Sequence, residues 1–346
     1  MLHTGLDLSR KRLDYCVLDA TGVVLERGAA LPTAAGLAAL AARVARHGQP
    51  VRATLEAMTG ARFVHDCLER GGWDVQIADA LKAKGLAPLA CKTDRIDAHV
   101  LAELSRRDLV PGLWLPNGEV QADRERARFR LHLVRQRSRL KHRIHATLLA
   151  HGVPCPVSDL FGGRGRELLA RAPLPEPWRT HVGTALALID DLTMRLRALD
   201  QALRARGTTH PDVPLLRTAP GIGWVLGYTI AAEIGDIRRF ATPTKLVGYT
   251  GLCPRVYQSG ARDRRGALTK LGPRYLRWAL VEAAPHAARH PVYRARYLRM
   301  KQRLGRQRGA KVAQIAIARQ LAAAIWYMLT RRHPFAPAGA PGALTA

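Results

Sequence analysis

The chain has few acidic side chains and few cysteines for its length. Its 346 residues include 27 Asp and Glu against 55 Lys and Arg, which gives a formal net charge of +28. The five cysteines lie far apart and form no C-x-x-C pair, so neither a disulfide framework nor a zinc site is expected. No apolar run approaches the roughly 20 residues that span a bilayer, and the N-terminus does not resemble a signal peptide. We therefore expect a cytoplasmic protein that does not act at a membrane.

The acids are scarce in one part of the chain only. Residues 1–118 hold 15 basic and 13 acidic side chains, a net of +2, whereas residues 119–346 hold 40 and 14, a net of +26. Such a field attracts polyanions, and nucleic acid is the first candidate because each neutralised phosphate releases a condensed counterion. An anionic membrane surface is disfavoured because no isolated amphipathic basic segment is present.

The first 120 residues alternate between short apolar runs and amphipathic segments. The pattern predicts, in chain order, strands at 2–8, 13–18 and 22–31, a helix at 33–47, a strand at 50–55, a helix at 59–70 and a strand at 73–77. Three sequential strands followed by helix, strand, helix and strand is the order of an RNase H-like (RuvC-like) α/β domain. We expect that domain at residues 1–120.

Four carboxylates fall at the ends of these elements. Asp7 ends the first strand, Glu56 ends the fourth, and a helix capped by Thr93 would place Asp94 and Asp97 on one face. Alone, Asp7 could equally be an exposed edge residue or a turn cap. In an RNase H-like sheet, however, the first and fourth strands are adjacent, and four converging carboxylates need cations to stay ionised. All four are therefore predicted to be catalytic and to bind Mg²⁺ or Mn²⁺, which prefer oxygen ligands.

A rival interpretation rests on "GLDLS" at 5–9, which resembles the first phosphate loop of sugar kinases and actin-like ATPases. Those proteins share the strand order, but they need a second nucleotide-binding half with its own Asp-Gly phosphate loop. The sequence shows no such loop, and a kinase has no use for a half with a net charge of +26.

The middle of the chain, residues 121–205, is predicted to form two long helices joined by a connector at 154–177. The first helix, at 122–151, is crowded with arginine. A solvated face is the ordinary explanation, but charges of one sign favour a helix that follows phosphates, with Arg135, Arg139 and Arg143 as contacts. The second helix has apolar residues at 3-4 spacing from 182 to 203, enough for a short coiled coil between subunits or for a hairpin within one chain.

Residues 206–346 are predicted to be mostly helical. The turn Pro220-Gly221-Ile222-Gly223 between two apolar helices resembles a helix-hairpin-helix. In that motif Gly221 and Gly223 would expose backbone N–H groups to a phosphate without side-chain obstruction. An ordinary tight turn between helices is the alternative.

Several motifs occur in an order that resembles the DEDD transposases of the insertion-sequence one-ten family, and the resemblance covers most of the chain. They are Asp7, "LEAMTG" at 55–60, "KTDRIDAHVLAEL" at 92–104, "APGIG" at 219–223 and "GYTGLCPRVYQSG" at 248–260. The resemblance implies a RuvC-like N-terminal domain, a helical middle and a C-terminal transposase domain with a serine nucleophile. It also implies a homo-oligomer, dimer or tetramer, that acts on paired DNAs and is guided by a structured RNA.

In this family pattern the acids are Asp7, Glu56, Asp94 and Asp97, and the nucleophile is Ser259. A Ser-Gly pair alone usually marks a turn, but the neighbouring arginines could hold a scissile phosphate and stabilise charge in the transition state. The predicted nucleic-acid contacts here and in the acidic motif are Lys92, Arg255, Arg262, Arg264 and Arg265.

We therefore expect a DNA transposase that works through a phosphoserine intermediate with carboxylate and metal assistance. Two alternatives remain open. One is a RuvC-like nuclease that hydrolyses branched DNA with metal-activated water, and the other is a non-catalytic nucleic-acid-binding protein.

Overall fold

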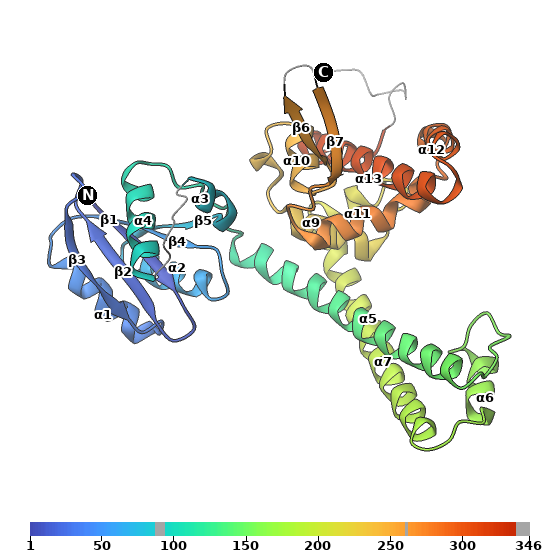
Figure 1. Cartoon of the computed structure of the whole chain (residues 1–346). Coiled ribbons are helices and arrows are strands. Elements are labelled where there is room, and N and C mark those ends of the chain that lie inside the picture. The colour runs from blue at the N-terminus through green and yellow to red at the C-terminus, as the bar shows by residue number, and fades with distance from the viewer. Residues whose placement is uncertain (87–93, 260–261, 337–346) are drawn as a thin grey trace. The chain divides into compact units, whose positions relative to one another are not determined.

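The computed structural model describes residues 1–86, 94–259 and 262–336, which form two compact units (Figure 1). Unit 1 covers Met1–Leu115 and unit 2 covers Pro116–Ala346. Unit 1 is a mixed α/β domain built on a five-stranded sheet, and unit 2 is largely helical. The predicted order along the chain, an α/β part followed by a helical part, is thus confirmed. The division into three parts at 120 and 205 stays a prediction.

The strands of unit 1 lie in the order β3-β2-β1-β4-β5. The first three strands are antiparallel neighbours, and β4 and β5 run parallel to β1. The register pairs Gly5 with Thr54 and Leu6 with Leu55, so β1 and β4 end beside each other. The predicted strands are confirmed within two residues at each end, with the bounds β1 Leu2–Leu8, β2 Leu13–Leu18, β3 Val24–Ala30, β4 Val51–Glu56 and β5 Asp74–Ala78.

Helices cover both faces of this sheet. The face that bears Leu2 and Leu6 forms the main core of the unit together with side chains of α1 and α2. The opposite face contacts α4, which packs on β1, β2 and β4. The helices are α1 Ala34–Ala45, α2 Ala61–Arg70, α3 Ala80–Leu86 and α4 Asp94–Arg106.

The backbones of α4 and β1 come very close together at Gly5. A Cβ atom there would lie 1.8 Å from the carbonyl oxygen of Ala98 and 2.5 Å from the nitrogen of Ala102, so only glycine fits. Farther along the helix, Ser105 Oγ and His3 Nδ1 form a hydrogen bond of 3.1 Å. Because Ser105 meets His3 and Ala98 meets Gly5, α4 runs antiparallel to β1. Its first turn therefore lies at the end of β1.

Unit 2 contains two apolar cores that are joined by a pair of long helices, α5 Gly118–Ala150 and α7 Trp178–Thr209 (Figure 1). These helices pack along each other, and most of the 182–203 stripe is buried within the chain. Of the two arrangements left open by the sequence, the structure therefore has the intramolecular hairpin. The predicted connector at 154–177 contains a helix, α6 Gly163–Arg171, which closes the smaller core.

The larger core is formed by the remaining helices. One of them, α13, is long and apolar enough by length and composition to cross a membrane, contrary to the expectation that the chain has no such segment. Its apolar side chains, including Ile317, Leu321 and Ile325, are buried in the core among α10, α11 and α12. The bounds are α8 Val213–Leu216, α9 Trp224–Ile234, the 3₁₀ turn η1 Ile237–Arg239, α10 Pro243–Tyr249, α11 Arg274–Ala287, α12 Pro291–Arg303 and α13 Arg306–Arg331.

A buried ion pair fixes α5 to α9. The side chain of Glu233, in the last turn of α9, is completely buried and accepts hydrogen bonds from Nε and Nη2 of Arg128 at 2.7 and 2.9 Å. Arg124 donates to the last backbone carbonyls of α9, which have no partner within the helix. Asp123 accepts a hydrogen bond from the hydroxyl of Tyr228, and burial raises the pKa of this tyrosine to about 12. Less than two turns of α5, residues 123–128, thus provide all of these contacts.

We expect Gly5→Ala to displace α4 from the sheet. The added methyl group would overlap backbone atoms, which cannot move aside as a flexible side chain can, so the destabilisation should reach about 3 kcal/mol or more. Hydrogen exchange followed by mass spectrometry should show lost protection in β1 and α4 and none in unit 2. Gly85→Ala is the matched control, because a Cβ at Gly85 meets no described atom within 4 Å. Wild-type protection in Gly5→Ala would contradict the close approach.

Arg128→Met should destabilise unit 2 by about 3 to 5 kcal/mol, because it leaves the Glu233 carboxylate buried without its partner. The double variant Arg128→Met/Glu233→Met should recover most of this loss, since packed apolar side chains can replace a buried ion pair at little cost. Urea unfolding followed by far-ultraviolet circular dichroism measures both. An unchanged free energy of unfolding in Arg128→Met would show that this pair does not hold α5 in place.

Candidate active site and nucleic-acid interface

Asp7 and Glu56 lie at the carboxyl ends of two adjacent parallel strands. Leu6 pairs with Leu55, and the next residue of each strand is one of the two acids. Because neighbouring residues of a strand alternate between faces, both acids lie on the face that α4 covers. Both are half-buried. We call this end of β1 and β4 the acidic edge.

Helix α4 directs the remaining acids to the acidic edge. Its antiparallel course, with Ala98 over Gly5, puts Asp97 in the turn that lies nearest the end of β1. Asp94 is the first residue of α4, so its backbone lies in the same first turn as Asp97. The side chain of Asp94 and the whole of Lys92 lie outside the described residues. The backbone alone therefore brings all four predicted positions to the same end of the sheet.

A fifth acid, Asp14, was not selected from the sequence. It is the cross-strand neighbour of Asp7 on β2 and is almost fully buried. Nε and Nη2 of Arg12 donate to its two oxygens, both at 2.8 Å, so its charge is compensated within the hairpin. The sequence did contain a signal for Asp14, because pairing the end of the first predicted strand, Leu8, with the start of the second, Leu13, places Asp14 opposite Asp7.

The donors at the acidic edge are carboxylate oxygens. Oxygen donors are the ligands that Mg²⁺ and Mn²⁺ prefer, so the chemistry of these residues fits a hard divalent cation. Among the residues whose side chains the structure describes, no three carboxylate, imidazole or thiol groups form a cluster that could hold a metal ion. Asp94 is the predicted ligand that falls outside this set.

Ser259 ends β6 Pro254–Ser259, which forms a two-stranded antiparallel hairpin with β7 Arg262–Leu268 (Figure 1). The register pairs Ser259 with Arg262 and Tyr257 with Arg264. Residues 255–258 and 264–267 are exposed, so the strands stand clear of the helical core. The side chains of Ser259 and Arg262 lie outside the described part of the structure.

The predicted arginines around Ser259 divide between the two faces of this hairpin. Arg264 pairs with a residue two positions before Ser259, so it shares the face of position 259. Arg255 lies on that same face, four positions before Ser259. Arg265 pairs with Val256 and so lies on the opposite face. Only one side of the hairpin therefore combines the serine position with a row of basic residues.

The base of the hairpin is tied to α10 and α11. Nη1 of Arg277 donates to the carbonyl oxygens of Thr250 and Lys270, both at 3.2 Å, and so links the two chain segments that lead into and out of the hairpin. Gly272 has a φ of +123°, and a Cβ there would lie 2.0 Å from the carbonyl oxygen of Tyr249. No sequence pattern pointed to Arg277, because its partners are backbone atoms.

The arginines of α5 do not form one continuous basic face. Arg135, Arg139 and Arg143 are exposed and lie four residues apart, so they form a single line along the helix, here called the α5 stripe. These three are the residues predicted to contact nucleic acid. Four other arginines are held by neighbouring helices: Arg124 and Arg128 by α9, and Arg130 and Arg137 by α7.

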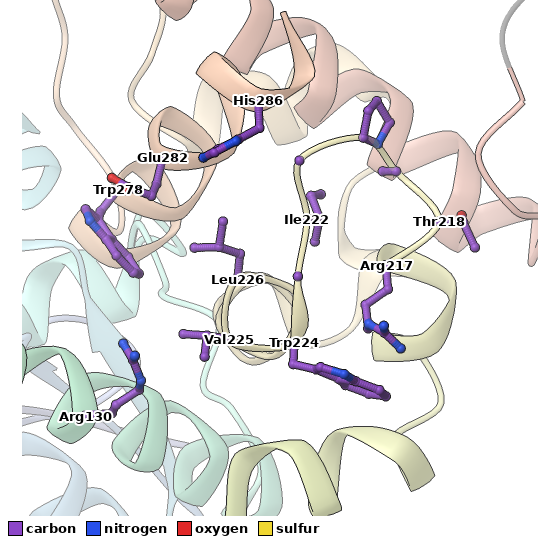
Figure 2. Close-up of a pocket in the computed structure, with 14 residues that line it drawn as sticks. Arg130, Arg217, Thr218, Ile222, Trp224, Val225, Leu226, Trp278, Glu282 and His286 are labelled. Atoms are coloured by element: carbon purple, nitrogen blue, oxygen red, sulfur yellow. The ribbon is translucent and has the colours of Figure 1, made fainter. Parts of the chain in front are cut away.

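The glycine turn before α9 forms one wall of a pocket of about 850 Å³ (Figure 2). Gly221 has a φ of +81°, and a Cβ there would lie 2.4 Å from the carbonyl oxygen of Ala283, so this glycine lets the turn sit against α11. A Cβ at Gly223 would meet no described atom within 4 Å. Only Gly223 therefore faces open space. The resemblance to a helix-hairpin-helix is limited, because α8 is a single turn of four residues.

Aromatic and basic side chains surround the same pocket. The guanidinium of Arg217 lies 3.5 Å from the ring centroid of Trp224, and Trp278 and His286 of α11 line the opposite wall (Figure 2). Such a combination is typical of surfaces that bind nucleic acid.

Two family models match the chain in regions that contain these sites. A DEDD transposase model for IS110 elements, described as "Transposase", matches residues 4–152 and includes the acidic edge. A model described as "Transposase IS116/IS110/IS902 family" matches residues 213–299 and includes the β6–β7 hairpin that carries Ser259, here called the serine hairpin. The chain belongs to the IS110 family of DEDD transposases.

Curated relatives of this transposase have similar lengths. The "Probable family 20 transposase" of Pseudomonas aeruginosa is 27% identical over 257 residues, covering 71% of the chain and 74% of the relative. The transposase for insertion sequence element IS1111A of Coxiella burnetii is 25% identical over 346 residues, covering 96% and 90%. The transposase for IS1328 of Yersinia enterocolitica is 25% identical over 291 residues, covering 82% and 84%. The protein is thus a DNA transposase, and a DEDD domain suggests dependence on a divalent metal.

Replacing the three arginines of the α5 stripe by glutamine should weaken DNA binding and its dependence on salt. The slope of log K against log[salt] should fall by roughly 2 to 3, at about 0.9 for each lost phosphate contact. Fluorescence anisotropy with labelled duplex at several salt concentrations measures this slope.

The matched control removes the same charge from α12, where three other exposed arginines are replaced by glutamine: Arg294, Arg296 and Arg299. An equal change of slope in both triple variants would show that net charge alone, and not the stripe, determines binding.

Proposed function

We propose that this transposase cuts and rejoins DNA through a covalent phosphoserine at Ser259. In this proposal Asp7, Glu56, Asp94 and Asp97 bind Mg²⁺ or Mn²⁺ and assist strand transfer. The observation that supports it best is the acidic edge, where two adjacent strands end in carboxylates and α4 directs its acidic first turn to the same place. The strand order β3-β2-β1-β4-β5 supports assignment of unit 1 to the RNase H-like (RuvC-like) fold.

The hydroxyl oxygen of Ser259 would form a bond to phosphorus while the bond to one bridging DNA oxygen breaks. The serine gives up its proton, and the released DNA oxygen takes one up. The phosphoserine link keeps the energy of the phosphodiester, so a second DNA hydroxyl can reverse the reaction without another cofactor. Arg255, Arg262 and Arg264, which share the face of position 259, would neutralise the non-bridging oxygens.

The backbone sets the positions of the carboxylates at the acidic edge. Strand ends fix Asp7 and Glu56, and the contact of α4 with Gly5 fixes the height of Asp97 above the sheet. A divalent cation held by these groups would supply Lewis-acid stabilisation of the charge that develops on the phosphodiester oxygens. Asp14 stays paired with Arg12 and adds no uncompensated charge to the edge.

We further propose that the transposase binds DNA together with a structured guide RNA, as a homo-oligomer in the cytoplasm. The net charge of +26 on residues 119–346 and the α5 stripe offer surface for more than one nucleic-acid strand. In this arrangement residues 1–120, 121–205 and 206–346 provide the RuvC-like part, the helical arm and the serine-bearing part.

Ser259→Ala and Asp7→Ala test the mechanism. Full-length protein, purified from its host with bound nucleic acid, is mixed with Mg²⁺ and DNA that spans the junction of the element, then separated on a denaturing gel. We expect a covalent protein–DNA band with wild-type protein and with Gln258→Ala, whose exposed side chain lies on the opposite face of β6. Both test variants should lose the band while hydrogen exchange stays unchanged.

Two other results would replace the proposal. Cleavage without a covalent band, lost only in Asp7→Ala, would identify a RuvC-like nuclease that hydrolyses DNA with metal-activated water and uses Ser259 as a turn residue. Binding without cleavage by the wild-type protein would identify a non-catalytic nucleic-acid-binding protein.

A further inference from the structure

The serine hairpin carries an aromatic side chain that the proposed reaction does not use. Tyr257 lies two residues before Ser259 in β6, and its side chain is exposed. Positions two apart in a strand lie on the same face, roughly 7 Å apart along the strand. An aromatic ring therefore stands on the face of the serine position, at about the spacing of one nucleotide.

The ring of Tyr257 is supported from below by the opposite strand. A Cβ atom at Gly266 would lie 3.1 Å from Cε2 of Tyr257, which means that the ring rests over a position without a side chain. Rings that cover a glycine of the neighbouring strand are a recognised means of stabilising hairpins. Here the contact uses one side of the ring, and 57% of the residue's surface remains exposed to solvent.

Charge on the same face selects the kind of partner that can cover this ring. Arg264 pairs directly with Tyr257, and Arg255 lies two residues before it; both are exposed. Exposed aromatic side chains between basic residues are the arrangement by which proteins bind single nucleic-acid strands, because bases stack on the ring while arginines contact the phosphates. A protein partner would have to bury both arginines against acidic groups, so the face favours a nucleic-acid strand.

We propose that Tyr257 is a positioning residue that stacks on the base next to the phosphate attacked by Ser259. The inference rests on the proposed function in one respect only, namely that Ser259 marks the reacting phosphate. By holding the neighbouring base unstacked from its own strand, the ring fixes the height of the phosphate above the hairpin. Gly266 also contributes to this positioning, because the absence of a side chain there sets the tilt of the Tyr257 ring.

The test uses the full-length Ser259→Ala protein with its bound nucleic acid, so that binding is measured without reaction. Junction DNA carries 2-aminopurine at one position at a time, because stacking on an aromatic ring quenches its fluorescence. We expect quenching at one position beside the phosphate that the covalent assay identifies. Adding Tyr257→Ala should abolish it and weaken binding by roughly 5- to 100-fold. Tyr257→Phe should retain both.

Two further variants separate stacking from hairpin stability. Tyr257→Leu keeps an apolar side chain over Gly266 but offers no ring, so it should lose the quenching. Gly266→Val keeps the tyrosine but pushes its ring away from the strand, and it should reduce the quenching as well. Val256→Ala, on the opposite face of β6, is the matched control and should bind and quench like the parent protein.

The outcomes for Tyr257 and for Ser259 are distinguishable. In the otherwise wild-type protein, Tyr257→Ala should raise KM for junction DNA more than it lowers kcat and leave the identity of the covalent residue unchanged. Equal quenching in the Tyr257→Leu and parent proteins would overturn the stacking role even if the phosphoserine forms. Conversely, quenching that depends on Tyr257 without any covalent product would uphold the strand contact and reject Ser259 as nucleophile.

Discussion

The meeting of two backbones at Gly5 determines the geometry of the acidic edge. Two of its carboxylates come from strand ends, and their separation is set by sheet hydrogen bonding. The others come from a helix, whose distance from a sheet is normally set by the side chains between them. At Gly5 no side chain intervenes, and the carbonyl oxygen of Ala98 takes the place where a Cβ would be. Gly5 thus belongs to the site as much as Asp7 does, although it has no functional group.

Much of unit 1 could be predicted from the sequence, because alternating apolar residues define both the strands and the face on which Asp7 and Glu56 lie. The role of Gly5 could not. A glycine within "GLDLS" is equally typical of a phosphate loop, and only the position of a helix that begins almost ninety residues later distinguishes the two. Asp14 could have been found by pairing the hairpin about its turn. Its near-complete burial and its ion pair with Arg12 become visible only in the structure.

The arginines of unit 2 show a different limit of the sequence. Locally, Arg128 and Arg135 have the same kind of neighbours, but the partner of Arg128 lies 105 residues farther along the chain. Composition therefore predicts a basic helix and cannot say which side chains are already neutralised. The serine motif has a similar limit. Its residues were predicted from a family pattern and not as strands, so the division of its arginines between two faces became visible only with the β6–β7 register.

The buried pair of Arg128 and Glu233 has a mechanical consequence. Hydrogen bonds of Arg130 and Arg137 to α7 make the two long helices one stiff arm, and the arm is attached to the larger core beside its start. Twenty residues of helix separate Arg128 from Leu148 in the smaller core, a length of roughly 30 Å. A rotation of about 10° at the attachment would swing that core through roughly 5 Å. The contacts of Asp123, Arg124 and Arg128 with α9 therefore form the attachment of this arm, and any strand bound along the α5 stripe would move with it.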